Sequence, residues 1–185
     1  VEVQGTVGEA PEHIFVIGSP EEVADLQVPD GSKVGYITQT TLSMDDTAEI
    51  ISALKKRYPE IQGPAKDDIC YATQNRQNAV KVLSKEVDLV LVVGAQNSSN
   101  SVRLLEVAQA TGAAARRIES AAELDPEWLE GVKNIGITAG ASAPEDIVQG
   151  IVSGLQNMYS SSNVRNLELI KEDVTFALPS VLRNA

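Results

Sequence analysis

The feature that most constrains the fold is an unbroken apolar run, Leu89 to Val93, which ends at Gly94. A strand with one wet face alternates apolar and polar residues, whereas a strand covered on both faces of a parallel sheet is apolar throughout. Small polar residues follow the run, and a stretch with helical periodicity, 102–109, comes directly after them. The order strand, polar turn, helix is that of an α/β unit, with the turn at the carboxyl end of the strand.

The same order recurs along the chain and predicts α/β units around mostly parallel sheets. A turn-rich stretch at 59–64 divides the chain into two expected α/β lobes, 1–64 and 65–157, and a C-terminal tail follows at 158–185. Strands are expected at 13–17, 34–38, 89–93, 113–118 and 135–138, with late strands at 168–170 and 174–178. Helices are expected after Ser19, Ser43, Ser99 and Ser142, over 73–83, and as a short helix after Asp125.

Composition narrows the classes of partner. The net charge of −11 argues against nucleic acid, because binding to phosphate backbones requires clustered Lys and Arg. A small phosphorylated ligand stays possible, since local backbone N–H groups bind anions on an acidic protein. Cys70 is the single cysteine and His13 the single histidine, which excludes an internal disulfide and a complete cysteine-based metal site. Without a membrane-length apolar run or a signal-peptide pattern, we expect a cytoplasmic protein with no membrane partner.

Two polar turns are the candidate binding sites. Ser98, Ser99 and Asn100 lie where the apolar run gives way to a helix, and Ser142 lies in a similar turn after a later strand. A helix N-terminus has free N–H groups and the positive end of the helix dipole, so it binds anions. Both turns are expected at the same edge of the sheet, where together they could hold a diphosphate. The simpler explanation is that these serines cap helices, and Ser142 with Glu145 has the spacing of a capping box.

Three further residues are weighed against simpler explanations. Thr40 lies in a third polar strand end, 38–43, although threonine is common in strands. Cys70 lies level with the other polar ends, although a lone cysteine is more often a small buried apolar residue. Glu2 has the simpler interpretation of a surface acid. The sequence has no P-loop and no Gly-x-Gly-x-x-Gly fingerprint, so the residues alone indicate a phosphate-binding α/β protein and no particular reaction.

Five sequence blocks carry a resemblance to a known family: Glu2 to Gly8 (EVQGTVG), 38–43 (TQTTLS), 66–73 (KDDICYAT), 97–101 (NSSNS) and 138–144 (TAGASAP). In residues and order they resemble the 4-hydroxy-3-methylbut-2-enyl diphosphate reductases, the enzymes of the last step of the non-mevalonate isoprenoid pathway. The resemblance runs from the first residue to about Pro144. It implies the second and third lobes of a three-lobed fold whose N-terminal lobe is absent here.

The resemblance also implies a reaction. Such enzymes reductively remove the allylic hydroxyl of their substrate, which yields isopentenyl and dimethylallyl diphosphate. The family carries a [4Fe–4S] cluster on three cysteines, and ferredoxin or flavodoxin is the implied electron donor. Cys70 would be the third cluster ligand, Glu2 would relay protons to the substrate, and Thr40 would line the pocket near the substrate hydroxyl. The diphosphate would be bound by Ser98, Ser99, Asn100 and Ser142.

The chain departs from the family pattern at its start. The family's first two cysteines and its substrate-binding histidines belong to an N-terminal portion that this sequence does not contain. We therefore expect the C-terminal part of such a reductase, cut just before Glu2, which carries the diphosphate half-site and is inactive alone. Two other functions stay open from the residues themselves. One is a phosphosugar-binding or isomerase-like α/β domain, and the other is an interaction domain in which every serine is a cap.

Overall fold

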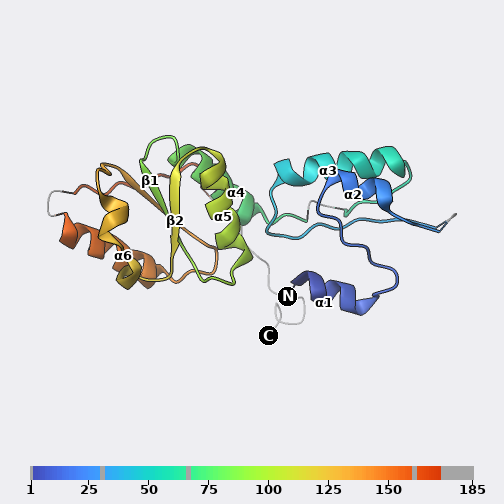
Figure 1. Ribbon diagram of the computed structural model, residues 1–185, viewed down its shortest axis with the longest axis horizontal. Helices are drawn as coiled ribbons and strands as arrows, with labels where there is room; N and C mark the ends of the chain where they lie inside the picture. The colour runs from blue at the N-terminus through green and yellow to red at the C-terminus, as the bar shows by residue number, and fades with distance from the viewer. Residues whose placement is uncertain (1, 30–31, 66–67, 160–161, 172–185) are drawn as a thin grey trace, which may run out of the picture.

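The computed structural model describes residues 2–29, 32–65, 68–159 and 162–171. Figure 1 shows two groups of elements along the long axis: α1, α2 and α3 on one side, and the sheet with α4, α5 and α6 on the other. The helices are α1 (Glu2–Glu9), α2 (Pro20–Asp25), α3 (Met44–Arg57), α4 (Tyr71–Leu83), α5 (Ser99–Ala110) and α6 (Glu145–Met158). The strands are β1 (Leu89–Val93), β2 (Ala114–Ile118) and β3 (Ile135–Ala139), and two short 3-10 helices are η1 (Ala121–Glu123) and η2 (Pro126–Leu129).

The sheet is parallel and has the order β2-β1-β3. Its register is even, because Val93, the last residue of β1, lies between Ile118 and Ala139, the last residues of β2 and β3. All three carboxyl ends therefore reach the same edge. The expected α/β fold is confirmed, and β1 covers the apolar run from which the strand was predicted.

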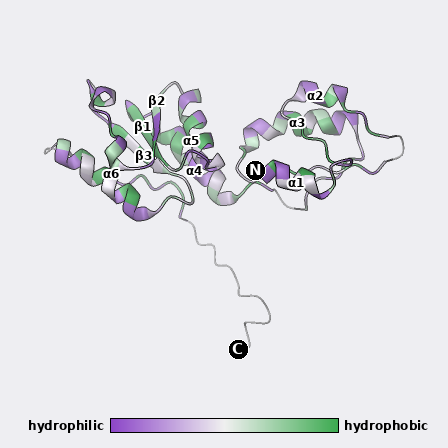
Figure 2. Cartoon of the chain, turned by 60° about the horizontal axis from the view of Figure 1, so that its bottom comes forward, coloured by the Kyte–Doolittle hydropathy of each residue, from purple (hydrophilic) through white to green (hydrophobic). Residues whose placement is uncertain are grey.

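The apolar run is explained by two cores, one on each face of the sheet. Leu91 packs on one face in a cluster that includes Ile151 of α6. Val90 and Val92 pack on the other face with Leu104 of α5. Full burial of each such side chain contributes about 1.5–3 kcal/mol of transfer free energy, so both faces of β1 must stay covered. Figure 2 shows hydrophilic and hydrophobic residues interspersed along α6, and its buried residues, Ile151 and Leu155, lie on one face, as expected of a helix that packs on a core.

The prediction of strands in the first group of elements is wrong, because neither expected segment forms a β-ladder. Within the described residues, this group has only one isolated bridge, in which Tyr36 N donates to Gln62 O at 2.9 Å. The expected strand at 13–17 is absent, and Phe15 is 51% exposed. Ile37, in the other expected strand, is 70% exposed. The apolar pattern marks residues that suit a sheet, but a ladder also needs a neighbouring strand, and that information is not local.

The helix starts expected at Ser19, Ser43 and Asp125 agree with the sequence, and the start expected at Ser142 does not. Ser19 and Ser43 are N-caps, and Ser43 Oγ accepts from Asp46 N at 3.1 Å. Ser142 does not cap α6, because Pro144 is the N-cap and the helix begins at Glu145. A cap at Ser142 would require a helical residue directly before proline, a conformation that the proline ring disfavours. The exposed hydroxyl of Ser142 is therefore not used by the helix.

The tail also differs from expectation. No strand forms at 168–170, and the expected strand at 174–178 lies outside the described residues. Arg165 reaches back to Glu86, with which it forms an ion pair. Among the helices that the structure describes, none combines the length and apolarity that a bilayer crossing would require.

Candidate functional site

The turn between β1 and α5 is built as a helix cap. Ser98 is the N-cap, and its Oγ accepts from Ser101 N at 3.3 Å. The hydroxyl of Ser101 donates to the same oxygen at 3.0 Å. Ser99 and Asn100 occupy the next two positions, at the end of the helix where backbone N–H groups lack intrahelical partners. The turn therefore offers donors at the positive end of the helix dipole.

Asn100 is the least satisfied residue of this turn. Its side chain is only 8% exposed, and neither Nδ2 nor Oδ1 has a hydrogen-bond partner among the described residues. A buried polar group without a partner costs about 1–3 kcal/mol, so native proteins rarely retain one without a reason. A bound ligand that accepts from Nδ2 would remove the part of this cost that belongs to the donor.

Two glycines bring the ends of β1 and β3 against the start of α5. A Cβ at Gly94 would lie 1.9 Å from Ser101 Oγ, and a Cβ at Gly140 would lie 2.4 Å from the same atom. The Gly140 position is also 3.7 Å from Nδ2 of Asn100. The turn that contains Ser142 therefore begins beside the unpartnered amide of Asn100, as expected for two strand ends at one edge of the sheet.

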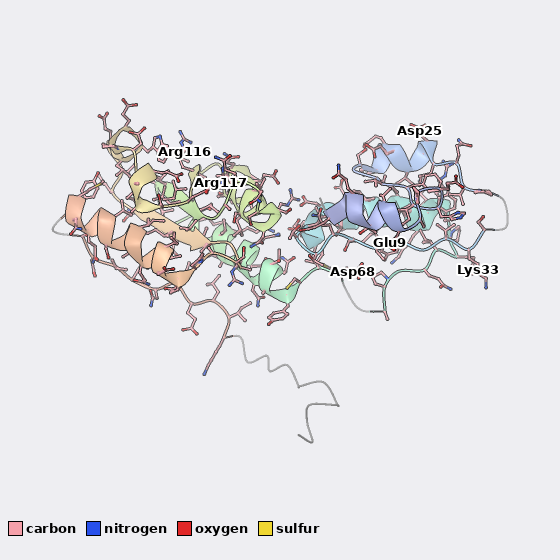
Figure 3. The ribbon with its side chains drawn as sticks, turned by 90° about the horizontal axis from the view of Figure 1, so that it is seen from below. Glu9, Asp25, Lys33, Asp68, Arg116 and Arg117 are labelled. Atoms are coloured by element: carbon pink, nitrogen blue, oxygen red, sulfur yellow. The ribbon has the colours of Figure 1, made fainter. Side chains whose placement is uncertain are left out.

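The β1–α5 turn is also held from β2. Arg117 Nη1 donates to Gly94 O at 3.0 Å, and Gln96 N donates to Glu119 Oε1 at 2.8 Å. Figure 3 shows Arg116 and Arg117 together on this part of the sheet. Both contacts fix the backbone of the turn from outside, so its shape does not depend on Ser98 alone. Sequence reasoning missed Arg117 and Glu119, because no local pattern shows that they lie beside Gly94.

A second set of predicted residues meets around the segment 38–40. Cys70 N donates to Thr40 O at 3.1 Å, and Thr38 N donates to Asp68 Oδ2 at 2.8 Å. Gln39 Nε2 donates to Glu2 Oε2 at 2.6 Å. Figure 3 shows Asp68 on the connection between the two groups of elements. Glu2, Thr40 and Cys70 are distant in sequence, but Glu2 and Cys70 both contact the segment 39–40 and therefore lie near each other in space.

Cys70 is not a buried apolar residue. It is exposed, stands at the N-cap of α4, and its side chain makes no capping hydrogen bond there. It lines a cavity of about 480 Å³ together with Asp68 and Tyr71. The thiol is accessible, but in the part of the chain that the structure describes no group of three or more His, Cys, Asp or Glu residues could hold a metal ion.

The two sets meet at a neighbouring cleft of about 450 Å³. Gln39 and Thr41 line it from the first group of elements, and Ser99 and Arg103 line it from α5. The cleft and the Cys70 cavity are separate. Gln39 and Thr41, on either side of Thr40, line the cleft, and Cys70, whose N–H donates to Thr40 O, lines the cavity. The lining of neither cavity includes Ser142. The structure thus brings Ser99 to the same open cleft as Gln39 and Thr41, the two neighbours of Thr40.

The comparisons with known proteins agree on one family. Residues 1–156 match the family model described as LytB protein. The chain is 51% identical to a 4-hydroxy-3-methylbut-2-enyl diphosphate reductase of Azoarcus sp., covering 100% of this chain and 59% of the relative. It is 53% identical to the reductase of that name from Bordetella pertussis, covering 98% of this chain and 55% of the relative. The chain therefore spans little more than half the length of these relatives.

A solved structure shows the same fold. The E-1-hydroxy-2-methyl-but-2-enyl-4-diphosphate reductase from Plasmodium falciparum superposes with a TM-score of 0.87 at 36% sequence identity. The match covers 100% of this chain and 58% of that structure. The family model covers most of the chain, and the superposition covers all of it. On these grounds the chain belongs to the LytB protein family.

Proposed function

We propose that this chain carries the diphosphate-binding half-site of a 4-hydroxy-3-methylbut-2-enyl diphosphate reductase. The observation that supports this most strongly is the buried, unpartnered amide of Asn100 at the N-terminus of α5, beside the turn that follows Gly140. The relatives named above supply the chemical class of the ligand. A diphosphate has enough acceptor oxygens to engage both turns at once.

In this proposal four residues bind the diphosphate: Ser98, Ser99, Asn100 and Ser142. Ser98 would act mainly through its place as the N-cap, because its oxygen already accepts from Ser101 N. Ser99 and Ser142 are exposed and have hydroxyls to donate, and Asn100 has a free amide. Hydrogen bonds to a charged ligand are stronger than neutral ones, so each is expected to contribute about 1.5–3 kcal/mol.

Glu2 and Thr40 are proposed to face the other end of the substrate. Gln39 Nε2 holds one carboxylate oxygen of Glu2 at 2.6 Å, which leaves the second oxygen for a proton. The proposed overall reaction removes the allylic hydroxyl as water and consumes two electrons and two protons. A carboxyl group in this place can deliver a proton to the departing oxygen, and Thr40 can orient that oxygen by a hydrogen bond.

The proposed iron–sulfur cofactor does not fit this chain by itself. Four irons need several thiolate ligands, and Cys70 is the single cysteine. We propose that Cys70 supplies one cluster ligand, because its thiol is exposed and its backbone N–H donates to Thr40 O. The remaining ligands must come from residues outside this sequence. The same applies to the docking of ferredoxin or flavodoxin, the proposed electron donors, so we expect no turnover from the chain alone.

A chimaera tests the proposal. This chain would replace the matching 59% of the Azoarcus reductase, and turnover with reduced methyl viologen would be measured after anaerobic cluster reconstitution. We expect the chimaera to be active. Cys70→Ser should abolish both the activity and the cluster's absorption, whereas Asn100→Asp should abolish the activity and leave that absorption unchanged. A folded chimaera that binds the cluster but shows no turnover would contradict the proposal. A fully active Cys70→Ser chimaera would contradict the proposed role of Cys70 as a cluster ligand.

A further inference from the structure

The two groups of elements are joined by a small set of side-chain contacts at the start of α3. Arg103 of α5 forms an ion pair with Asp46, and Lys81 of α4 forms one with Asp45 at 2.5 Å. Both acids lie in the first turn of α3. Two amides add to this contact: Gln74 Oε1 accepts from Met44 N at 3.3 Å, and Gln77 Nε2 donates to Leu42 O at 3.4 Å.

Arg103 is held on both sides. Besides Asp46, it pairs with Glu106 at 2.6 Å, and its side chain is only 22% exposed. Asp46 is itself fixed, because Ser43 Oγ donates to its carboxylate at 2.5 Å. Residues four apart lie on one face of a helix, so Arg103 lies one turn after Ser99 on the same face of α5, and both residues line the cleft. With two carboxylates on one guanidinium, the arginine is neutralised and does not act as a free anion-binding group.

We propose that Arg103 is a positioning residue of the diphosphate site. It acts through Asp46 and holds the first turn of α5, which carries Ser99 and Asn100, against the segment 39–42. The inference rests on the proposed function, because it names the diphosphate as the ligand whose binding depends on this contact. Arg103 sets where the donors of α5 stand relative to the segment that carries Thr40, and it does not touch the ligand.

Two neighbouring acids give a matched pair of variants. Asp46→Asn breaks the contact to α5, whereas Asp45→Asn breaks only the more exposed contact to α4. Each removes one negative charge near the cleft, so electrostatics alone would strengthen the binding of an anion in both. The positioning role predicts the opposite sign for Asp46→Asn alone. Asp46→Glu keeps the carboxylate at the usual capping-box position and should restore binding.

The experiment uses the 185-residue chain and two measurements. Calorimetric titration with pyrophosphate should show that Asp46→Asn raises Kd about three- to fivefold, as expected for loss of a partly exposed ion pair, while Asp45→Asn leaves Kd within about twofold. Spin labels at Glu49→Cys and Gln109→Cys, both exposed positions, would report the distance between α3 and α5 in a Cys70→Ser background. The distance distribution should widen with Asp46→Asn and with Arg103→Gln.

The outcomes separate the two proposals. Equal Kd values for Asp45→Asn and Asp46→Asn, or an unchanged distance distribution in Asp46→Asn, would overturn the positioning role and leave the diphosphate site standing. A narrow distance distribution in the labelled chain with Asp46 and Arg103 intact, combined with no binding of pyrophosphate by the chain, would overturn the proposed function and with it the ligand named here. A raised Kd with a widened distribution, both reversed by Asp46→Glu, is the expected result.

Discussion

The contact of Gly94 with Ser101 gives a prediction whose size can be worked out. In Gly94→Ala the new Cβ would lie 1.9 Å from Ser101 Oγ and 2.7 Å from Ser101 Cβ. Ser101 is 1% exposed, and its Oγ is also packed against Gly140, so rotation of the side chain finds little room. Overpacking of this kind costs about 1–3 kcal/mol, and we expect the upper end here. For a chain of this length, 3 kcal/mol corresponds to about 6–12 °C in Tm.

A second substitution tests the reasoning. Ser101→Ala removes Oγ and leaves Cβ, which would stay 2.7 Å from the Gly94→Ala methyl but 3.6 Å from the Gly140→Ala methyl. The second distance is an ordinary contact. Ser101→Ala should therefore relieve Gly140→Ala almost fully and Gly94→Ala only in part, after allowance for about 1 kcal/mol from the lost hydrogen bond to Ser98.

Urea unfolding followed by circular dichroism would give the free energy of unfolding for both glycine variants, with and without Ser101→Ala. Equal relief of the two glycine variants would refute the reasoning, as would a Gly94→Ala protein as stable as the parent. Either result would show that the end of β1 and the start of α5 are less tightly packed than the structure indicates.

Three further predictions concern stability. Leu91→Ala should lower the free energy of unfolding by about 2–5 kcal/mol in urea titrations, because Leu91 is fully buried; a loss below 1 kcal/mol would contradict this. Ser43→Ala should cost about 1 kcal/mol as a lost cap, whereas Ser142→Ala should change thermal unfolding by less than about 0.5 kcal/mol; equal losses would be inconsistent with the observed start of α6. Asp88 accepts from Lys133 N at 3.0 Å and from Asn134 N at 2.8 Å, with the Asn134 bond the larger cause of a pKa below its usual 3.8. The stabilisation is complete above pH 3.8 and is lost as pH falls through the lowered pKa, so acid titration of Asp88→Asn should lack this part of the pH dependence.

Sequence reasoning worked well where the signals are local. The continuous apolar run predicted β1 and its burial on both faces, and the polar turn after Gly94 predicted a helix after Ser99, one residue from the observed start of α5. Ser43, followed by acids in the first turn, predicted α3 through Arg57. In each case the residues that form the sequence pattern are also those that are buried in β1 or that cap the helix.

The failures have nonlocal causes. Phe15 and Ile37 have strand-like neighbours in sequence, but the described residues provide no ladder for them. The pairing of Arg103 with Asp46 joins two helices that are far apart in the chain, and no short motif announces it. The prediction that Ser142 caps α6 failed for a local reason, because Pro144 disfavours a helical residue before it despite the capping-box spacing.

The central claim is that the turns after β1 and β3 grip one doubly phosphorylated molecule. The most direct measurement is a proton–nitrogen NMR titration of the chain with pyrophosphate, in which backbone amides of 98–101 and 140–143 are followed together. If one ligand binds both turns, both groups of amides should shift with one common Kd, and Asn100→Asp should abolish both shifts at once. Shifts confined to one turn, or two different Kd values, would contradict it.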